Sequence, residues 1–174
     1  MTVDSERSSK LKIIAISGLI AAFVFIGTEI HVPTAIGYIN LGDAVILVAS
    51  FLLGPAACIP AAVGSALGDL IAGYAVYIGP TFVIKGAMGA VAGLVYSGNC
   101  SFKKSDSCNG KCRLIRRIAA AVAAEAIMCA GYFAFESILY GVPAAGASVV
   151  FNCVQAIAGI VLATPLTYAI RVKL

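Results

Sequence analysis

Residues 10–30 read KLKIIAISGLIAAFVFIGTEI, a run that begins with two lysines and is then almost wholly apolar. Its length suits an α-helix that crosses the hydrocarbon core of a bilayer, which takes about 20 residues. No small-residue cleavage motif follows, so we interpret the run as a first membrane span and not as a signal peptide. The segment predicts a membrane protein.

The composition of the whole chain supports this interpretation. Of its 174 residues, 61% are hydrophobic and only 11% are charged, against roughly 25% charged in an average soluble domain. The mean hydropathy of +1.01 points the same way. A soluble globule of this size would lack the polar side chains to cover its surface. We therefore expect residues 1–174 to form a single transmembrane domain in the all-α class.

Six spans are predicted, from Pro and Gly breaks and from one hydrophilic stretch. Residues 31–40 contain Pro33, Gly37 and Asn40 and are expected to form an irregular loop. The later spans are predicted at residues 41–53, 55–74, 80–97, 114–139 and 145–170, with a hydrophilic loop at 98–113. Because residues 41–53 fall short of the usual length, whether that segment crosses completely is left open.

Basic residues predict the orientation of this bundle. Of 12 Lys and Arg residues, 11 form three clusters, and Lys85 alone lies inside an apolar segment. The clusters contain Arg7, Lys10 and Lys12; Lys103, Lys104, Lys111, Arg113, Arg116 and Arg117; and Arg171 and Lys173. With six spans and a cytoplasmic N-terminus, all three clusters lie inside, as the positive-inside rule requires. Both termini and the 98–113 loop are therefore expected in the cytoplasm, and nucleic-acid binding is disfavoured.

Ionisable side chains in apolar helices are costly, so they indicate ion pairs, cavities or ligand sites. Asp69 and Lys85 lie at similar depths on adjacent predicted helices, which makes an ion pair between them possible. Such a pair could simply neutralise both charges, or both groups could contact a ligand. Glu125, Tyr132 and Glu136 share one face of the fifth helix with Cys129, at spacings of three and four residues.

Most of the remaining polar side chains of the spans map to the outer half of the bundle. Asn152 and Gln155 share a face of the sixth helix, where they could bond a ligand or only a neighbouring helix. The tyrosines could belong to an interfacial aromatic belt. Taken together, the set suits a planar, polar, heteroaromatic ligand. The candidate site comprises Tyr38, Asn40, Asp43, Asp69, Tyr74, Tyr77, Lys85, Tyr132, Glu136, Asn152 and Gln155.

Catalytic and metal-binding motifs are missing from the sequence. It contains no Walker A loop, nucleophile elbow or H-E-x-x-H helix, and its single histidine is His31. Cys100, Cys108 and Cys112 lie in the 98–113 loop without a familiar zinc spacing or a fourth ligand. We expect no enzyme activity, no cofactor and no metal site.

Residues 38–93 carry four elements in a distinctive order: N-L-G-D at 40–43, L-L-G-P at 52–55, G-S-A-x-x-D at 64–69 and I-K-G at 84–86. In these elements the chain resembles the substrate-binding subunits, or S components, of energy-coupling-factor (ECF) vitamin transporters. The likeness is greatest to the riboflavin, pyridoxine and hydroxymethylpyrimidine types, and it extends over most of the chain. Gly18 and Ala22 resemble the Ala-x-x-x-Ala surface of those proteins, with glycine in place of the first alanine.

The resemblance implies a six-helix bundle in the prokaryotic plasma membrane, with both termini inside. It implies high-affinity capture of a vitamin from outside, and import driven by a transmembrane (T) subunit and two cytoplasmic ATPases. Gly18 and Ala22 would dock on the T subunit. The absence of Trp disfavours thiamine; a pyridoxine- or hydroxymethylpyrimidine-type ligand is preferred and riboflavin comes next. The alternatives are a stand-alone carrier or channel that works without ATPases, and a membrane scaffold without a ligand.

Overall fold

The structure is a computed structural model that describes residues 3–34, 37–97 and 110–170. These residues are almost entirely helical, which confirms the all-α class. In chain order the elements are α1 (Val3–Glu29), β1 (His31–Thr34), β2 (Gly37–Asn40), α2 (Gly42–Leu53), η1 (Gly54–Ala57), α3 (Cys58–Ile71), η2 (Ala75–Tyr77), α4 (Ile78–Ser97), α5 (Gly110–Tyr140) and α6 (Val142–Ala169).

Five segments of the described chain are long and apolar enough to cross a membrane. They are Leu11–Glu29, Gly42–Ile71, Ala75–Ser97, Leu114–Tyr140 and Val142–Ala169. The second segment joins α2, η1 and α3, so six separate spans are not confirmed. At 12 residues, α2 is only about 18 Å long by the helical rise, well short of a bilayer core of about 30 Å.

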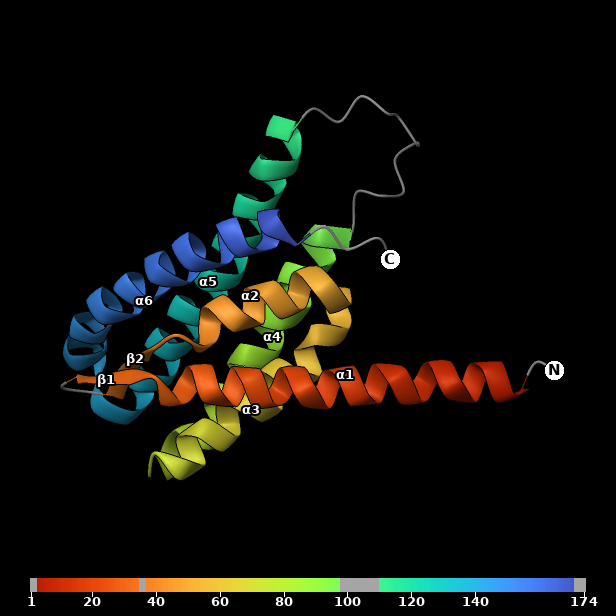
Figure 1. Cartoon of the computed structure of the whole chain (residues 1–174). Helices are drawn as coiled ribbons and strands as arrows, with labels where there is room; N and C mark the ends of the chain where they lie inside the picture. The colour runs from red at the N-terminus through yellow and green to blue at the C-terminus, as the bar shows by residue number, and fades with distance from the viewer. Residues whose placement is uncertain (1–2, 35–36, 98–109, 171–174) are drawn as a thin grey trace.

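Gly54 and Pro55 separate α2 from α3, as the sequence predicts. Gly54 has a φ of +59°, a left-handed conformation that glycine adopts without steric cost. Pro55 follows in the first turn of η1, where its missing N–H is not needed. In Figure 1 the chain reverses at this turn, on the side of the bundle where α1 begins and α6 ends.

Residues 31–40 differ from the irregular loop expected there, because their described part forms an antiparallel β-hairpin. His31 pairs with Asn40, and Val32 pairs with Ile39. β-Branched and aromatic side chains favour extended backbone, and a two-stranded ribbon tolerates Pro33 because each strand has a free edge. Figure 1 places the hairpin at the opposite end of the bundle from the start of α1 and the end of α6.

The predicted hydrophilic loop falls largely on residues 98–109, which lie outside the described residues, and its three cysteines lie outside the side chains described.

Neighbouring helices of the described chain pack closely where small residues meet. A Cβ on Gly64 of α3 would lie 2.5 Å from the backbone oxygen of Ala21 on α1. A Cβ on Gly93 of α4 would lie 2.1 Å from the carbonyl carbon of Gly54. The small residues of α3 and α4 therefore allow close helix packing.

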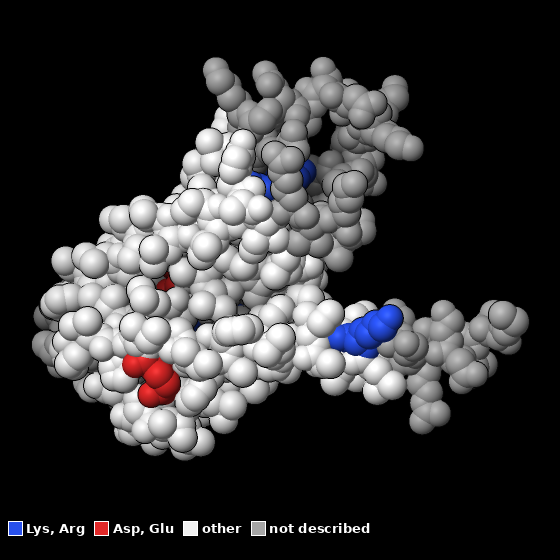
Figure 2. Space-filling model, in the orientation of Figure 1, with Lys and Arg blue, Asp and Glu red and all other residues white. Residues whose placement is uncertain are grey.

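The outer surface of the described chain is mainly apolar, as a protein surrounded by lipid requires. Figure 2 shows one face that is mostly uncharged, with basic atoms on the projecting part of α1 and near the grey atoms at the top, and one group of acidic atoms at the lower left. Part of α1 has no partner among the described residues: apart from the adjoining residues and backbone of α1 itself, no described atom lies within 4 Å of a Cβ built on Gly18, and Ala22 is exposed. The face expected to dock a partner is therefore open.

Candidate functional site

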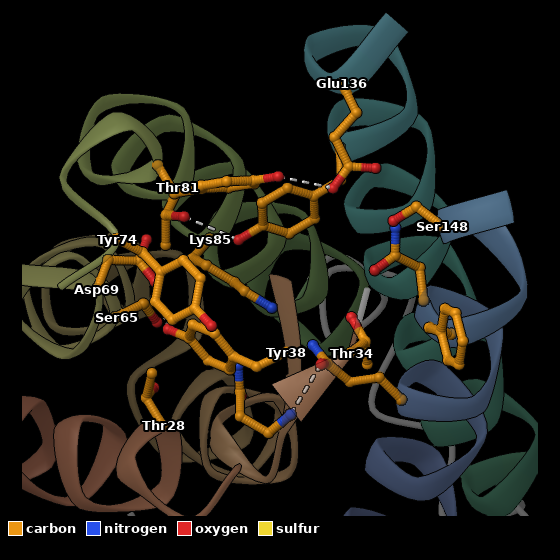
Figure 3. Close-up of a pocket in the computed structure, with 16 residues that line it drawn as sticks. Thr28, Thr34, Tyr38, Ser65, Asp69, Tyr74, Thr81, Lys85, Glu136 and Ser148 are labelled. Carbon is orange, nitrogen blue, oxygen red and sulfur yellow. Dashed lines mark hydrogen bonds between the residues drawn. The ribbon is translucent and has the colours of Figure 1, made fainter. Parts of the chain in front are cut away.

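A cavity lies between the hairpin and the helices at that end of the bundle. The empty space in it, together with open solvent at its mouth, is about 530 Å³. Figure 3 shows Tyr38, Tyr74 and Asp69 on one side and Glu136 and Ser148 on the other. The cavity is lined by Thr28, Thr34, Tyr38, Asn40, Ser65, Asp69, Tyr74, Tyr77, Thr81, Lys85, Tyr132, Glu136, Ser148, Phe151, Asn152 and Gln155.

Aromatic rings form a connected series along the cavity wall. The rings of Tyr38 and Tyr74 have centroids 4.9 Å apart, and those of Tyr74 and Tyr77 are 6.2 Å apart. Tyr77 in turn lies 6.4 Å from Tyr132. Such rings offer faces and edges on which a flat ligand can stack. The hairpin, η2 and α5 each contribute to this wall, so it exists only once these elements pack together.

Tyr38 connects the hairpin to α3. Its hydroxyl donates a hydrogen bond to the carboxylate of Asp69, which is 3% exposed. Burial of the ring, and next the hydrogen bond to Asp69, raise the pKa of the Tyr38 hydroxyl. Tyr38 therefore stays protonated and acts as a donor to Asp69. Because it bridges two elements, it holds the hairpin over the cavity.

Lys85 forms an ion pair with Asp43, so the pairing with Asp69 considered from the sequence is wrong. Lys85 and Asp43 are 2% and 0% exposed, and the ammonium donates a hydrogen bond to Asp43 Oδ1. The difference arises because α2 begins directly after the hairpin, which places Asp43 in a first turn that faces α4. Asp69 is instead bonded to Tyr38.

Gln155 joins α6 to the hairpin and to α2. Its side-chain oxygen accepts a hydrogen bond from the backbone N–H of Asn40 at 2.9 Å. Its side-chain nitrogen donates to Asp43 Oδ2 at 2.6 Å. The Asn40 side-chain oxygen accepts from the backbone N–H of Gly42, two residues on, and so satisfies the first N–H of α2. Residues far apart in sequence thus form one buried network beside the cavity.

Two further pairs connect α4, η2 and α5 at the cavity wall. The hydroxyls of Thr81 and Tyr132 lie 2.9 Å apart, and Tyr77 donates to Glu136 at 3.3 Å. The ammonium of Lys85 lies 5.5 Å from the centre of the Tyr132 ring, in the range of a cation–π contact. The Asn152 amide nitrogen is buried without a partner in the described part of the chain, so it remains available to a ligand.

All but one of the predicted site residues line this cavity. The exception is Asp43, whose side chain lies behind the wall and contacts Lys85 and Gln155. The predicted polar face of α5 also points inward, although Glu125 and Cys129 lie outside the lining. Six lining residues are not among those predicted from the sequence: Thr28, Thr34, Ser65, Thr81, Ser148 and Phe151.

A helical signal could have identified half of these missed residues. Ser65, Thr81 and Ser148 each precede a predicted site residue by four positions, namely Asp69, Lys85 and Asn152. Positions four apart lie one above the other on a helix face. A small hydroxyl in that place therefore points to the same cavity as the larger polar group.

Comparison with known proteins identifies the family. Residues 8–172 match the sequence profile of the family described as "ECF-type riboflavin transporter, S component". The chain belongs to this family. This S component is also 31% identical over 147 residues to a protein from Pyrococcus woesei described as "Uncharacterized protein in gap 3'region", a match that covers 84% of this chain and 90% of that one.

Family membership explains the combination of a polar cavity and an apolar exterior. S components are substrate-binding subunits of vitamin transporters and are not enzymes. They work with the T subunit and the ATPases of an ECF transporter. This S component is thus a multi-pass membrane protein, consistent with its apolar helices.

Proposed function

We propose that this S component captures a planar heteroaromatic vitamin at the hairpin end of the bundle and delivers it to an ATPase-driven coupling module in the prokaryotic plasma membrane. The observation that carries the proposal is the cavity itself. It combines tyrosine rings with amides and with a buried ammonium group, which is the chemistry that a flat, polar ring system needs.

Riboflavin is the first ligand to test. The sequence alone favours a pyridoxine- or hydroxymethylpyrimidine-type ligand, but the family description moves riboflavin to first place. Its ring system would stack on the tyrosines, and its hydroxylated tail would suit the carboxylates and hydroxyls of the cavity. The smaller vitamins would use the same groups with fewer contacts.

The proposal also covers the direction of vitamin entry and the contact with the T subunit. The vitamin would enter from outside, with the chain ends and the Gly54 turn on the cytoplasmic side, the arrangement that the basic clusters predict. Gly18 and Ala22 would contact the T subunit, because only small side chains allow such close approach between membrane helices. The open face of α1 supports this role.

Mass spectrometry of small molecules released from the purified protein by heat or acid tests the ligand. We expect a stoichiometric flavin, visible as a yellow preparation, or tight binding of added riboflavin in a thermal-shift assay. A bound pyridine or pyrimidine would keep the proposed class but replace the first candidate. An empty protein that ignores a panel of vitamins would contradict the proposal. Vitamin uptake by liposomes that hold only this chain would favour a stand-alone carrier.

A further inference from the structure

The hydrogen bonds of Gln155 fix the orientation of its amide. A carboxylate only accepts hydrogen bonds and a backbone N–H only donates them. Asp43 therefore receives the Gln155 NH2 group, while Asn40 N–H bonds to the Gln155 oxygen. The Gln155 oxygen thus already accepts one hydrogen bond within the protein. Of the two N–H groups of its amide, one is held by Asp43 and the other is left for the cavity.

Lys85 offers the same kind of group. An ammonium has three donors and no acceptor, and one donor is used by Asp43. The others lie at the cavity, near the ring of Tyr132. Asn152 adds a further donor, since its amide nitrogen is buried without a partner among the described residues. Three neighbouring cavity groups from α4 and α6 thus present hydrogen-bond donors.

The two carboxylates of the cavity lie elsewhere. Asp69 is two residues from the end of α3 and Glu136 four residues from the end of α5, about 3 and 6 Å along their axes. Lys85 is seven residues inside α4 and Gln155 thirteen inside α6, about 10 and 20 Å along theirs. Measured along the helices, Lys85 and Gln155 therefore lie deeper than the two carboxylates; we call the end of the cavity at Lys85 and Gln155 its floor and the end at the carboxylates its rim.

Asp43 creates this polarity without lining the cavity. Its side chain is 0% exposed, and its two oxygens hold Lys85 and Gln155, one each. We infer that Asp43 is a positioning residue, and that the ligand enters with an edge of hydrogen-bond acceptors, such as ring carbonyl oxygens or ring nitrogens, directed at Lys85 and Gln155. This inference rests on the proposed function and adds to it which end of the vitamin is buried.

Flavin analogues provide the test. Riboflavin is compared with analogues in which each of the two ring carbonyl oxygens in turn is replaced by sulfur, a weak acceptor, and with one that lacks the hydroxylated tail. In the wild-type protein we expect at least one sulfur analogue to bind 10-fold or more weakly. In Asp43→Asn we expect riboflavin itself to bind at least 10-fold more weakly. In this variant the loss of affinity caused by sulfur should fall below threefold. The new amide has one acceptor oxygen in place of two, so it cannot hold both Lys85 and Gln155 in their wild-type orientation.

The analogue without the hydroxylated tail serves as an internal control. It should lose the same factor of affinity relative to riboflavin in Asp43→Asn as in the wild-type protein, since the tail would lie at the rim. Glu125→Gln is the matched control: Glu125 is also a buried carboxylate, 2% exposed, but it has no hydrogen-bond partner among the described residues and does not line the cavity. Glu125→Gln should retain the sulfur penalty.

A second variant guards against misfolding of Asp43→Asn. Gln155→Leu leaves the Asp43–Lys85 ion pair in place and removes one floor donor, so it too should reduce the sulfur penalty. If wild-type protein binds riboflavin and either folded variant keeps the full penalty, or if neither sulfur analogue is penalised in wild-type protein, the inference is wrong and the proposed function stands. A wild-type protein that binds only a pyridine or pyrimidine vitamin overturns the inference and leaves the proposed class standing, and one that binds no vitamin at all overturns both.

Discussion

At the scale of single residues, the Tyr38 hydroxyl is the clearest bond between the hairpin and the bundle. We expect Tyr38→Phe to lower the free energy of unfolding by about 1–3 kcal/mol, because Asp69 would lose a buried donor. This contribution should be complete below about pH 10, the usual pKa of tyrosine in an unfolded chain. Above that pH it should decline, since the unfolded chain loses the Tyr38 proton while the folded protein, with its raised pKa, keeps it.

Denaturant titration in detergent from neutral to alkaline pH measures this effect. Tyr168→Phe is the matched control, because Tyr168 is 64% exposed and its ring would still contact Arg117. That change should alter stability by less than about 0.5 kcal/mol. A pH-independent difference between wild-type and Tyr38→Phe would contradict the prediction.

Asn152 should contribute to binding and not to stability. Its amide nitrogen is buried and unpaired in the described chain, so the free protein gains nothing from that group. We expect Asn152→Ala to leave the melting temperature unchanged or raise it slightly, and to weaken vitamin binding about 10-fold, which corresponds to the roughly 1.4 kcal/mol of one good hydrogen bond. Titration calorimetry measures the affinity, with the exposed Val154→Ala as control. Equal loss of stability and affinity would indicate a structural role.

Sequence reasoning predicted which side chains face the interior, but not every partner. The helical period places Asp69, Lys85 and Gln155 on inward faces. The helical period does not give the position of the first turn of α2 relative to α4, because that position depends on how the hairpin packs against the bundle. Asp43 was therefore assigned to ligand contact, whereas it lies behind the cavity wall and pairs with Lys85.

At the scale of elements, α1 and α3 are held together by glycine. A Cβ on Gly64 would lie 2.5 Å from Ala21 O and 2.8 Å from Val24 Cβ, so even a methyl group must push the helices apart. We expect Gly64→Ala to lower the free energy of unfolding by about 1–3 kcal/mol, the usual cost of overpacking. Gly146→Ala on α6 has open space at its Cβ and should be neutral or slightly stabilising. Denaturant titration in detergent compares the two, and similar losses in both would refute the packing argument.

Element boundaries follow from the sequence where proline or glycine interrupts an apolar run, as at Gly54 and at Gly141, although α6 begins at Val142 and not at the expected residue 145. The sequence did not predict the elements whose conformation depends on tertiary contacts. The hairpin at residues 31–40 was missed because Pro33 and Gly37 indicate a loop, while the partner strand lies in the same short segment. Likewise, hydropathy alone cannot separate α2 and α3, which together form one continuous apolar segment of 30 residues.

At the scale of the whole molecule, capture of the vitamin and assembly with the transporter should use separate surfaces. The cavity lies at the hairpin end, whereas Gly18 and Ala22 lie on α1 with no described residue packed over Gly18. We expect the double variant Gly18→Leu, Ala22→Leu to bind the vitamin with unchanged affinity. Because close approach at this face would be blocked, it should no longer copurify with the T subunit and the ATPases. Gly146→Leu adds equal bulk per site at an open position on α6, so it should bind the vitamin and copurify with the T subunit and the ATPases as the wild-type protein does. Retained assembly of the double variant would mean that another face of the bundle docks, and lost vitamin binding would mean that α1 supports the cavity as well.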